Sequence, residues 1–281
     1  MDALPIIDAH HHLWRYDARE YGWIDEPLAA LRRDFLLPEL ARARAEGGVS
    51  ATIAVQARQS VEETRWLLGL AAQEPAIVGV VGWLPIASPR LEAELDGIRG
   101  PLIALRHVVQ GEADGFLDDP AFDRGLEVVA RRDLAYDLLI RDWQLPEAVR
   151  CVGRHPRLRF VLDHGAKPDL RPGGDLAAWE AGIRDLARHP QVWCKLSGLV
   201  TEADWATWDL ATIRRAFDVL LDAFGPQRLL FGSDWPVCLV ASGYARWLGT
   251  VRTLIADLPL GDRAAILAGN AATVYRLRSP A

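Results

Sequence analysis

The stretch Ile6-Ile7-Asp8-Ala9-His10-His11-His12, near the start of the chain, is a short apolar run that ends in three histidines. Side chains alternate along a β-strand, so His10 and His12 share one face with Asp8, and His11 takes the other. Two imidazoles two residues apart on a strand can hold one small ion or polarise one oxygen. Asp8, one step deeper, is placed to orient a ring by accepting its free N–H. The stretch predicts a strand that carries histidines into a functional site.

Seven further apolar runs follow along the chain, with longer helical segments between them. The runs are mostly continuous, as expected for parallel strands that are buried on both faces. With the first, the predicted strands are Ile6–His12, Ala51–Ala57, Ile77–Leu84, Leu102–Val108, Ala135–Ile140, Arg159–His164, Val192–Ser197 and Leu229–Asp234. Apolar residues recur at helical spacing in Leu210–Phe224 and Arg246–Leu258. Eight alternating strand and helix units predict an α/β fold, a (β/α)8 TIM-type barrel.

Composition indicates an ordinary globular chain without a nucleic-acid or membrane partner. The 281 residues, 50% apolar and 25% charged, suit one barrel domain over 1–281. A net charge of −6 leaves no basic patch for nucleic acid or an anionic membrane. Cys151, Cys194 and Cys238 form no disulfide framework. We see no signal peptide and no apolar run of the ~18 residues that a spanning helix needs, so a cytoplasmic location is expected.

The carboxyl ends of the predicted strands gather an unusual set of polar side chains. In a barrel these ends surround one mouth, where catalysis takes place. Five of the seven histidines fall there, namely His10, His11, His12, His107 and His164. Asp234 ends the eighth strand, and the long irregular segment Arg15–Leu37 follows the first, which predicts a cap over the mouth. Core packing does not account for so many imidazoles, so the pattern predicts an active site.

Four longer motifs, in order along the chain, resemble a known family. They are Arg106–Gln110, Leu162–Pro168, Lys195–Leu199 and Phe231–Pro236. With Asp8-Ala9-His10-His11-His12, they resemble the amidohydrolase-2 branch of the amidohydrolase superfamily, and within it the sugar-lactonase group. That group includes L-fuconolactonases and L-rhamnonolactonases. The resemblance runs nearly end to end and implies an amidohydrolase-type barrel.

The resemblance implies hydrolysis of an L-fucono- or L-rhamnono-type aldonolactone to the aldonic acid. Asp234 would be the general base that activates water, since a free carboxylate is ionised at neutral pH. The imidazoles that would polarise the carbonyl and stabilise the oxyanion are His10, His12, His107 and His164. Arg106 would add hydrogen bonds to the substrate. The proton gained by Asp234 is the economical source for the leaving alkoxide, with His164 or His107 as alternatives.

The ligand set of a metal is left open. The predicted fourth to sixth strands carry no lysine, so a two-metal site bridged by a carboxylated lysine is not expected. One divalent ion, Zn²⁺ first, fits the set His10, His12, His164 and Asp234. Glu202 is either an extra ligand or a solvated loop carboxylate. Because a lactone is an activated ester, metal-independent turnover is favoured.

Several side chains near the strand ends are candidates for contacting a sugar. Indole stacks on the apolar face of a sugar ring, and the candidates are Trp14, Trp83, Trp143 and Trp235, with core packing as the alternative. Lys195 either binds a substrate oxygen or pairs with Asp163 or Glu202. Lys167 is interpreted as a loop charge.

Two other functions are alternatives to the lactonase. A metal-dependent decarboxylase of an aromatic or unsaturated acid would use the same barrel, but the lactonase-like motifs argue against it. A binding protein without catalysis would gain little from an ionised carboxylate that faces the carbonyl of its ligand. The identity of the lactone depends on one or two hydroxyl orientations, which the sequence does not specify.

Overall fold

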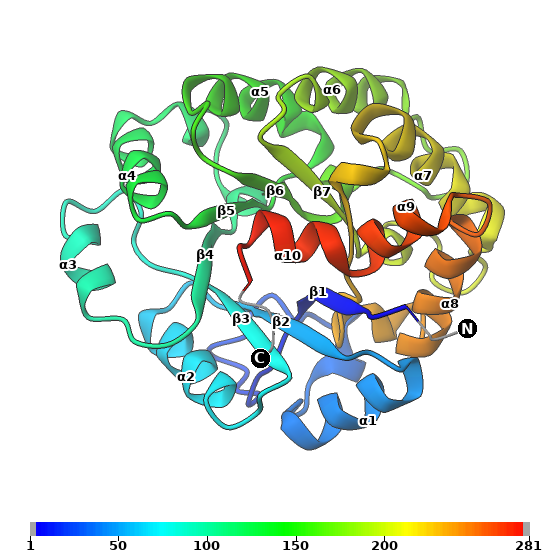
Figure 1. The fold of residues 1–281 in the computed structure, drawn as a ribbon, viewed down its shortest axis with the longest axis horizontal. Coiled ribbons are helices and arrows are strands. Elements are labelled where there is room, and N and C mark those ends of the chain that lie inside the picture. The colour runs from blue at the N-terminus through cyan, green and yellow to red at the C-terminus, as the bar shows by residue number, and fades with distance from the viewer. Residues whose placement is uncertain (1–3, 278–281) are drawn as a thin grey trace.

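The computed structural model describes residues 4–277, and its centre is a barrel of eight parallel strands. Each strand pairs with the next in chain order, as Figure 1 shows, which confirms the predicted (β/α)8 fold. The strands are β1 Ile7–His11, β2 Ala51–Val55, β3 Ile77–Gly82, β4 Leu102–His107, β5 Ala135–Leu138, β6 Phe160–Leu162, β7 Val192–Leu196 and β8 Leu229–Phe231.

Helices pack against the strands, most of them on the outer faces of the barrel (Figure 1). They are α1 Leu37–Gly47, α2 Val61–Ala71, α3 Leu91–Asp96, α4 Pro120–Arg131, α5 Leu145–Arg154, α6 Ala177–Ala187, α7 Leu210–Phe224, α8 Tyr244–Leu254, α9 Leu260–Ala264 and α10 Asn270–Val274. The predicted helix 210–224 is confirmed as α7, whereas the second one begins two residues earlier and ends four residues sooner, as α8. A π-helical segment, Ala265–Gly269, joins α9 to α10.

Local capping determines where several of these helices begin. The Ser60 side chain accepts a hydrogen bond from the Glu63 amide at the start of α2. At the start of α4, whose first residue is Pro120, the Asp119 side chain accepts a hydrogen bond from the Ala121 amide. Each cap satisfies a backbone N–H that has no partner inside the helix. These caps therefore determine where α2 and α4 begin.

The barrel closes between its first and last strands. The amide of His12 donates to the carbonyl of Trp235 at 2.6 Å, and the amide of Asp234 donates to the carbonyl of His10 at 2.8 Å. Both β6 and β8 are shorter than predicted, and they end before Asp163 and before Asp234. The acids and His164 therefore lie in turns just past the strands, where their backbone is free to leave the ladder.

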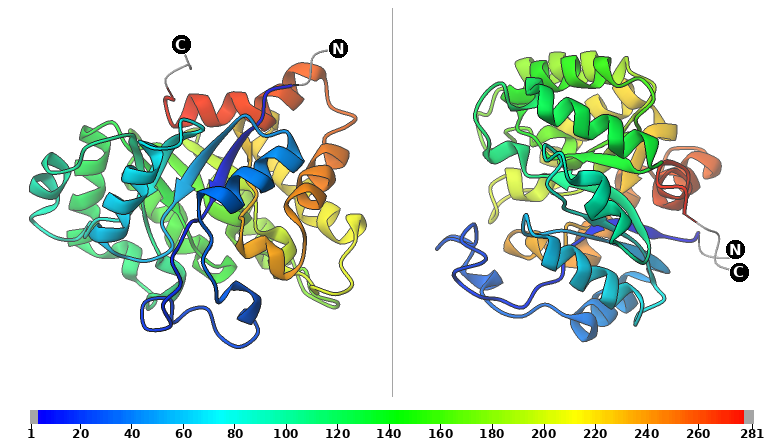
Figure 2. Two further views of the ribbon diagram at one scale, coloured as in Figure 1. Left: turned by 90° about the horizontal axis from the view of Figure 1, so that it is seen from below. Right: turned by 90° about the vertical axis from the view of Figure 1, so that its left-hand side faces the viewer.

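Apolar side chains fill the amino-terminal part of the barrel interior, and α10 closes that end. Ala271, Val274 and Tyr275 pack with interior residues such as Val161 and Leu230. Figure 2, left, shows α10 at one end of the barrel and the long segment after β1 at the other. A separate and larger core fills the space between strands and helices. The site end is thus opposite to α10.

None of the helices within residues 4–277 combines the length and the apolar character that crossing a membrane requires.

Candidate active site

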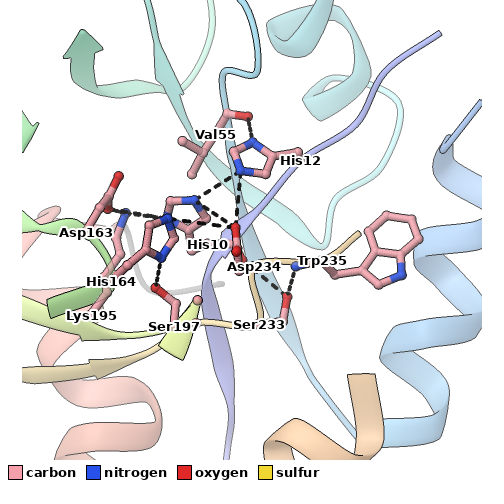
Figure 3. A network of polar contacts seen from close by, with 12 residues as sticks. His10, His12, Val55, Asp163, His164, Lys195, Ser197, Ser233, Asp234 and Trp235 are labelled. Atoms are coloured by element: carbon pink, nitrogen blue, oxygen red, sulfur yellow. Dashed lines mark hydrogen bonds and ion pairs between the residues drawn. The ribbon is translucent and has the colours of Figure 1, made fainter. Parts of the chain in front are cut away.

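Strand β1 delivers its histidines as the alternation predicts. His11 turns away from the site, with its Nε2 at 3.1 Å from Thr52 Oγ1. His12 Nδ1 lies 2.8 Å from the carbonyl oxygen of Val55, as Figure 3 shows. A carbonyl only accepts, so Nδ1 carries the proton and Nε2 presents its lone pair to the site, 3.2 Å from His10 Nε2. His12 is therefore oriented as an acceptor or a ligand on the site side.

Two site residues have a backbone conformation that non-glycine residues rarely adopt. The φ angles are 56° at His164 and 55° at Asp234. Such left-handed conformations persist where the surroundings impose them, and they cluster at functional sites. The hydrogen bond from the Asp234 amide to the carbonyl of His10 holds the turn at Asp234. The 2.8 Å contact of His164 Nδ1 with Ser197 Oγ fixes the ring of His164. Both turns direct their side chains to the same point.

The carboxylate of Asp234 is the point at which three imidazoles meet (Figure 3). Its Oδ1 lies 3.6 Å from His10 Nε2, 3.5 Å from His12 Nε2 and 3.9 Å from His164 Nε2. All four side chains are buried. Burial lowers the pKa of His164 to about 4, so this ring is neutral at pH 7. Burial opposes ionisation of Asp234, but the adjacent His164 and His12 outweigh it and lower its pKa. An ionised acceptor thus faces the neutral ring of His164.

Asp8 does not orient a histidine ring, and that expectation was wrong. Its carboxylate accepts from the Ser233 amide at 2.7 Å, the Ser233 hydroxyl at 2.6 Å and the Tyr244 hydroxyl at 2.8 Å. It therefore ties β1 to the turn that carries Asp234. The acid beside the His10 ring is Asp163, with Oδ1 at 3.3 Å from Nδ1. The sequence could not show this because Asp163 comes from the far side of the barrel.

Lys195 lies beneath the site and not on its surface. Its side chain is fully buried, with Nζ at 2.9 Å from Asp163 Oδ1 and in contact with Asp137. It also lies 3.1 Å from His10 Nδ1. The structure therefore pairs Lys195 with Asp163, one of the two acids considered, and removes it from reach of a substrate. Arg106 completes the layer, donating to Asp163 Oδ2 at 2.9 Å.

A cavity of about 550 Å³, the inner cavity, opens onto this centre. His12, His164, Asp234 and Arg106 form part of its wall. The segment after β1 covers it as expected, because its residues Trp23, Asp25 and Leu28 also line the cavity. The volume lies within the ~300–1,000 Å³ that is usual for small-molecule sites. The cluster is thus accessible to a small ligand.

Other predicted substrate contacts do not reach the inner cavity. His107 is next to Arg106 on β4, and strand alternation turns it outward, where it pairs with Glu112 at 2.7 Å. Trp83 donates to the other nitrogen of His107 at 3.2 Å. Trp14 is fully buried under the segment after β1, where it donates to the carbonyl of Arg33, and Trp235 is also buried. None of these four side chains lines the inner cavity.

The loops after β5, β6 and β7 bring further residues that the sequence analysis missed or misplaced. The inner cavity is lined by Trp205, Arg141 and Lys167. The interpretation of Lys167 as a loop charge alone is therefore incomplete. Glu202 is 3.2 Å from Lys167 and 3.6 Å from Arg141, so it faces cations and not the histidines. These residues lie in irregular segments without periodicity. Only their position after strand ends could have drawn attention to them.

The spacing of three donor atoms at the centre of the site suits a metal ion. The atoms His10 Nε2, His12 Nε2 and Asp234 Oδ1 lie 3.2, 3.6 and 3.5 Å apart. Tetrahedral Zn²⁺ with bonds near 2.0–2.1 Å separates its ligand atoms by about 3.3 Å. These three residues therefore fit one divalent ion. His164 belongs instead to a second cluster, with His10 and Asp163, and Glu202 belongs to neither among the residues described.

Residues 7–277 match the family model described as amidohydrolase, and the chain belongs to that family. It is similar to an L-fucono-1,5-lactonase of Burkholderia multivorans, with 44% identity over 100% of this chain and 99% of that one. A protein of the same name from Burkholderia ambifaria is 37% identical, over 98% and 96%. A crystal structure of a Burkholderia multivorans amidohydrolase with bound Zn has a TM-score of 0.95 and 43% identity, and the match covers 98% of this chain and 100% of that one.

Proposed function

We propose that this protein is a lactonase that opens a sugar-derived lactone of the L-fucono or L-rhamnono type to the aldonic acid. The observation that carries the proposal is the buried Asp234 carboxylate, within 4 Å of three imidazoles at the wall of the inner cavity. The names of the relatives that are 44% and 37% identical support the same substrate class. An ionised carboxylate at the wall of a cavity is suited to taking a proton from water.

In the proposed reaction, Asp234 removes a proton from water as the water oxygen bonds to the lactone carbonyl carbon. Negative charge develops on the carbonyl oxygen and is stabilised by donors in the wall, Arg106 and His164. Ser197 can donate to His164 Nδ1, which leaves the ring proton on Nε2, toward Asp234. The ring C–O bond then breaks, and the proton on Asp234 passes to the leaving alkoxide. Water and lactone give the hydroxy acid with no other reactant.

The geometry of the site permits a bound divalent ion but does not require one. His10, His12 and Asp234 would hold it, and when bound it would polarise the carbonyl and acidify the water. The Zn in the related Burkholderia multivorans structure supports Zn²⁺ as the ion. Arg106 Nη1 lies 3.4 Å from His10 Nε2 and places a second positive charge beside that position. The guanidinium supplies electrostatic help of its own, which favours turnover without metal.

The decarboxylase alternative lacks comparable support. A decarboxylase of this kind requires a firmly held metal. The relatives that are 44% and 37% identical are both named lactonases, and neither is named a decarboxylase. We expect the enzyme to act in the cytoplasm as one barrel domain over residues 1–281, and cell fractionation checks the location.

The decisive experiment measures acid release with a pH indicator across a panel of sugar lactones, with enzyme treated or not treated with chelator. We expect rapid release from one stereochemical series. Loss of activity after chelation, and its return with Zn²⁺, would establish a metal requirement, whereas unchanged activity would show that none exists. No release from any lactone by metal-loaded enzyme would overturn the proposal.

A further inference from the structure

A second cavity of about 820 Å³, the outer cavity, adjoins the inner one. The residues that line both cavities are Arg141, Lys167, Thr201, Glu202 and Trp205. Asp234, His12 and His164 line only the inner cavity, whereas Trp143 lines only the outer one. A ligand whose reactive group sits at Asp234 can therefore extend over this shared wall into the outer cavity.

The inner cavity is large enough to hold a single sugar ring, so one ring does not need the outer cavity. About 550 Å³ already lies in the range usual for drug-sized ligands, and a one-ring sugar lactone is smaller than those. The reacting ring is thus accommodated without the outer cavity. An adjoining space of this size, walled by residues that also face the reacting ring, suits a substituent on that ring.

The lining of the outer cavity has the chemistry of a sugar site. Trp143 is 63% exposed, the largest exposed fraction of any tryptophan in the described chain. The second indole, Trp205, is fixed by donation of its Nε1–H to the carbonyl of Thr201 at 3.0 Å. Indole faces pack on the C–H face of a pyranose, while polar neighbours bind its hydroxyls. Such a combination of exposed aromatic and polar side chains is typical of carbohydrate contact.

Each cation in the lining of the outer cavity is paired with a carboxylate, which argues against an anionic ligand. Glu202 lies between Lys167, at 3.2 Å, and Arg141, at 3.6 Å. Arg171 pairs with Asp169 at 2.7 Å. The Asp204 carboxylate accepts backbone N–H groups of its own turn. Paired charges still offer donors and acceptors to hydroxyls, so a neutral, hydroxyl-rich group fits this lining.

We propose that the outer cavity is a subsite for a second sugar ring, and that the substrates of this enzyme include glycosyl-substituted aldonolactones. This inference rests on the proposed lactonase function. The reacting lactone ring occupies the inner cavity, and the attached pyranose lies in the outer cavity against Trp143 and Trp205. Only the ring ester is cleaved, by the water addition described above, and the glycosidic bond is retained in the product.

The test compares two kinds of aldonolactone from the stereochemical series that the enzyme opens fastest: the unsubstituted lactone as the parent, and disaccharide lactones in which a pyranose is attached to one hydroxyl of that parent. The measured quantity is the ratio of kcat/KM for each disaccharide lactone to that for its parent. We expect a ratio above one for at least one linkage in the wild-type enzyme. Trp143→Ala is expected to lower that ratio about five- to tenfold, because it removes the exposed ring. Trp143→Phe, which keeps an aromatic face, should retain most of it.

The outcomes separate this inference from the proposed function. Turnover of monosaccharide lactones, with no disaccharide lactone above its parent, would overturn the second-ring subsite and leave the lactonase intact. A ratio above one that Trp143→Ala does not change would also overturn it. If no lactone of either size is opened, both proposals fail together.

Discussion

At the scale of single residues, the chemistry depends on Asp234, the carboxylate that three imidazoles approach within 4 Å. Its lowered pKa keeps it ionised through the neutral range, as a general base must be. We expect Asp234→Asn to reduce kcat by about 10²–10⁴-fold, because the amide has nearly the same volume but accepts no proton. Initial rates on the best lactone of the panel measure the effect.

The melting temperature of Asp234→Asn is the control for folding. It should stay close to that of the wild-type protein, because the amide can still donate or accept within the same cluster. Near-normal kcat in a folded variant would show that another group activates water.

At the scale of elements, the turn after β7 determines where His164 points. Gly198 has φ +63°, and a Cβ at this position would lie 2.5 Å from His164 Nδ1. Gly198→Ala therefore adds a steric clash to a left-handed backbone, and it should displace the ring from Ser197. We expect at least a tenfold fall in kcat/KM together with a lower melting temperature. Both are measured on the purified variant.

Gly48→Ala is the matched control for this prediction. Gly48 follows the last residue of α1 and has nearly the same φ, +66°, but a Cβ there meets nothing within 4 Å. It should show the conformational cost alone, about 1 kcal/mol, with normal activity. Equal losses of activity in the two variants would mean that contact with His164 is not the cause.

At the scale of the whole molecule, a buried layer of charges connects the site to the opposite end of the barrel. Lys195 bridges Asp163 and Asp137, and the Tyr275 hydroxyl, just past α10, donates to Asp137 at 2.8 Å. Lys195→Met leaves both carboxylates in the interior without that cation. We expect a loss of about 3–5 kcal/mol in the free energy of unfolding, measured by urea titration.

Combining Lys195→Met with Asp137→Asn tests the cause of that loss. The double variant removes one of the uncompensated charges, while Asp163 keeps Arg106 at 2.9 Å. It should therefore recover part of the lost stability. If it is less stable than Lys195→Met alone, buried charge is not the origin of the effect.

The sequence by itself determined the barrel and the identity of its central residues. Continuous apolar runs separated by helical periods leave little choice of fold, and period-two alternation alone places His10 and His12 on one face and His11 on the other. Asp234 and His164 were found because strand ends in a barrel converge. These inferences are local, since each depends on the direction of a side chain relative to its own strand.

Only the tertiary structure decided which polar groups meet across the barrel. The partners of Asp8, Lys195 and Glu202 come from distant parts of the chain. His107 and Trp14 lie near the mouth in sequence but are turned away from it. Packing determines the positions of such side chains, because a buried charge is stable only beside an opposite charge and a buried indole needs a space of its size. Both conditions depend on contacts between segments that are far apart in sequence, which no local pattern records.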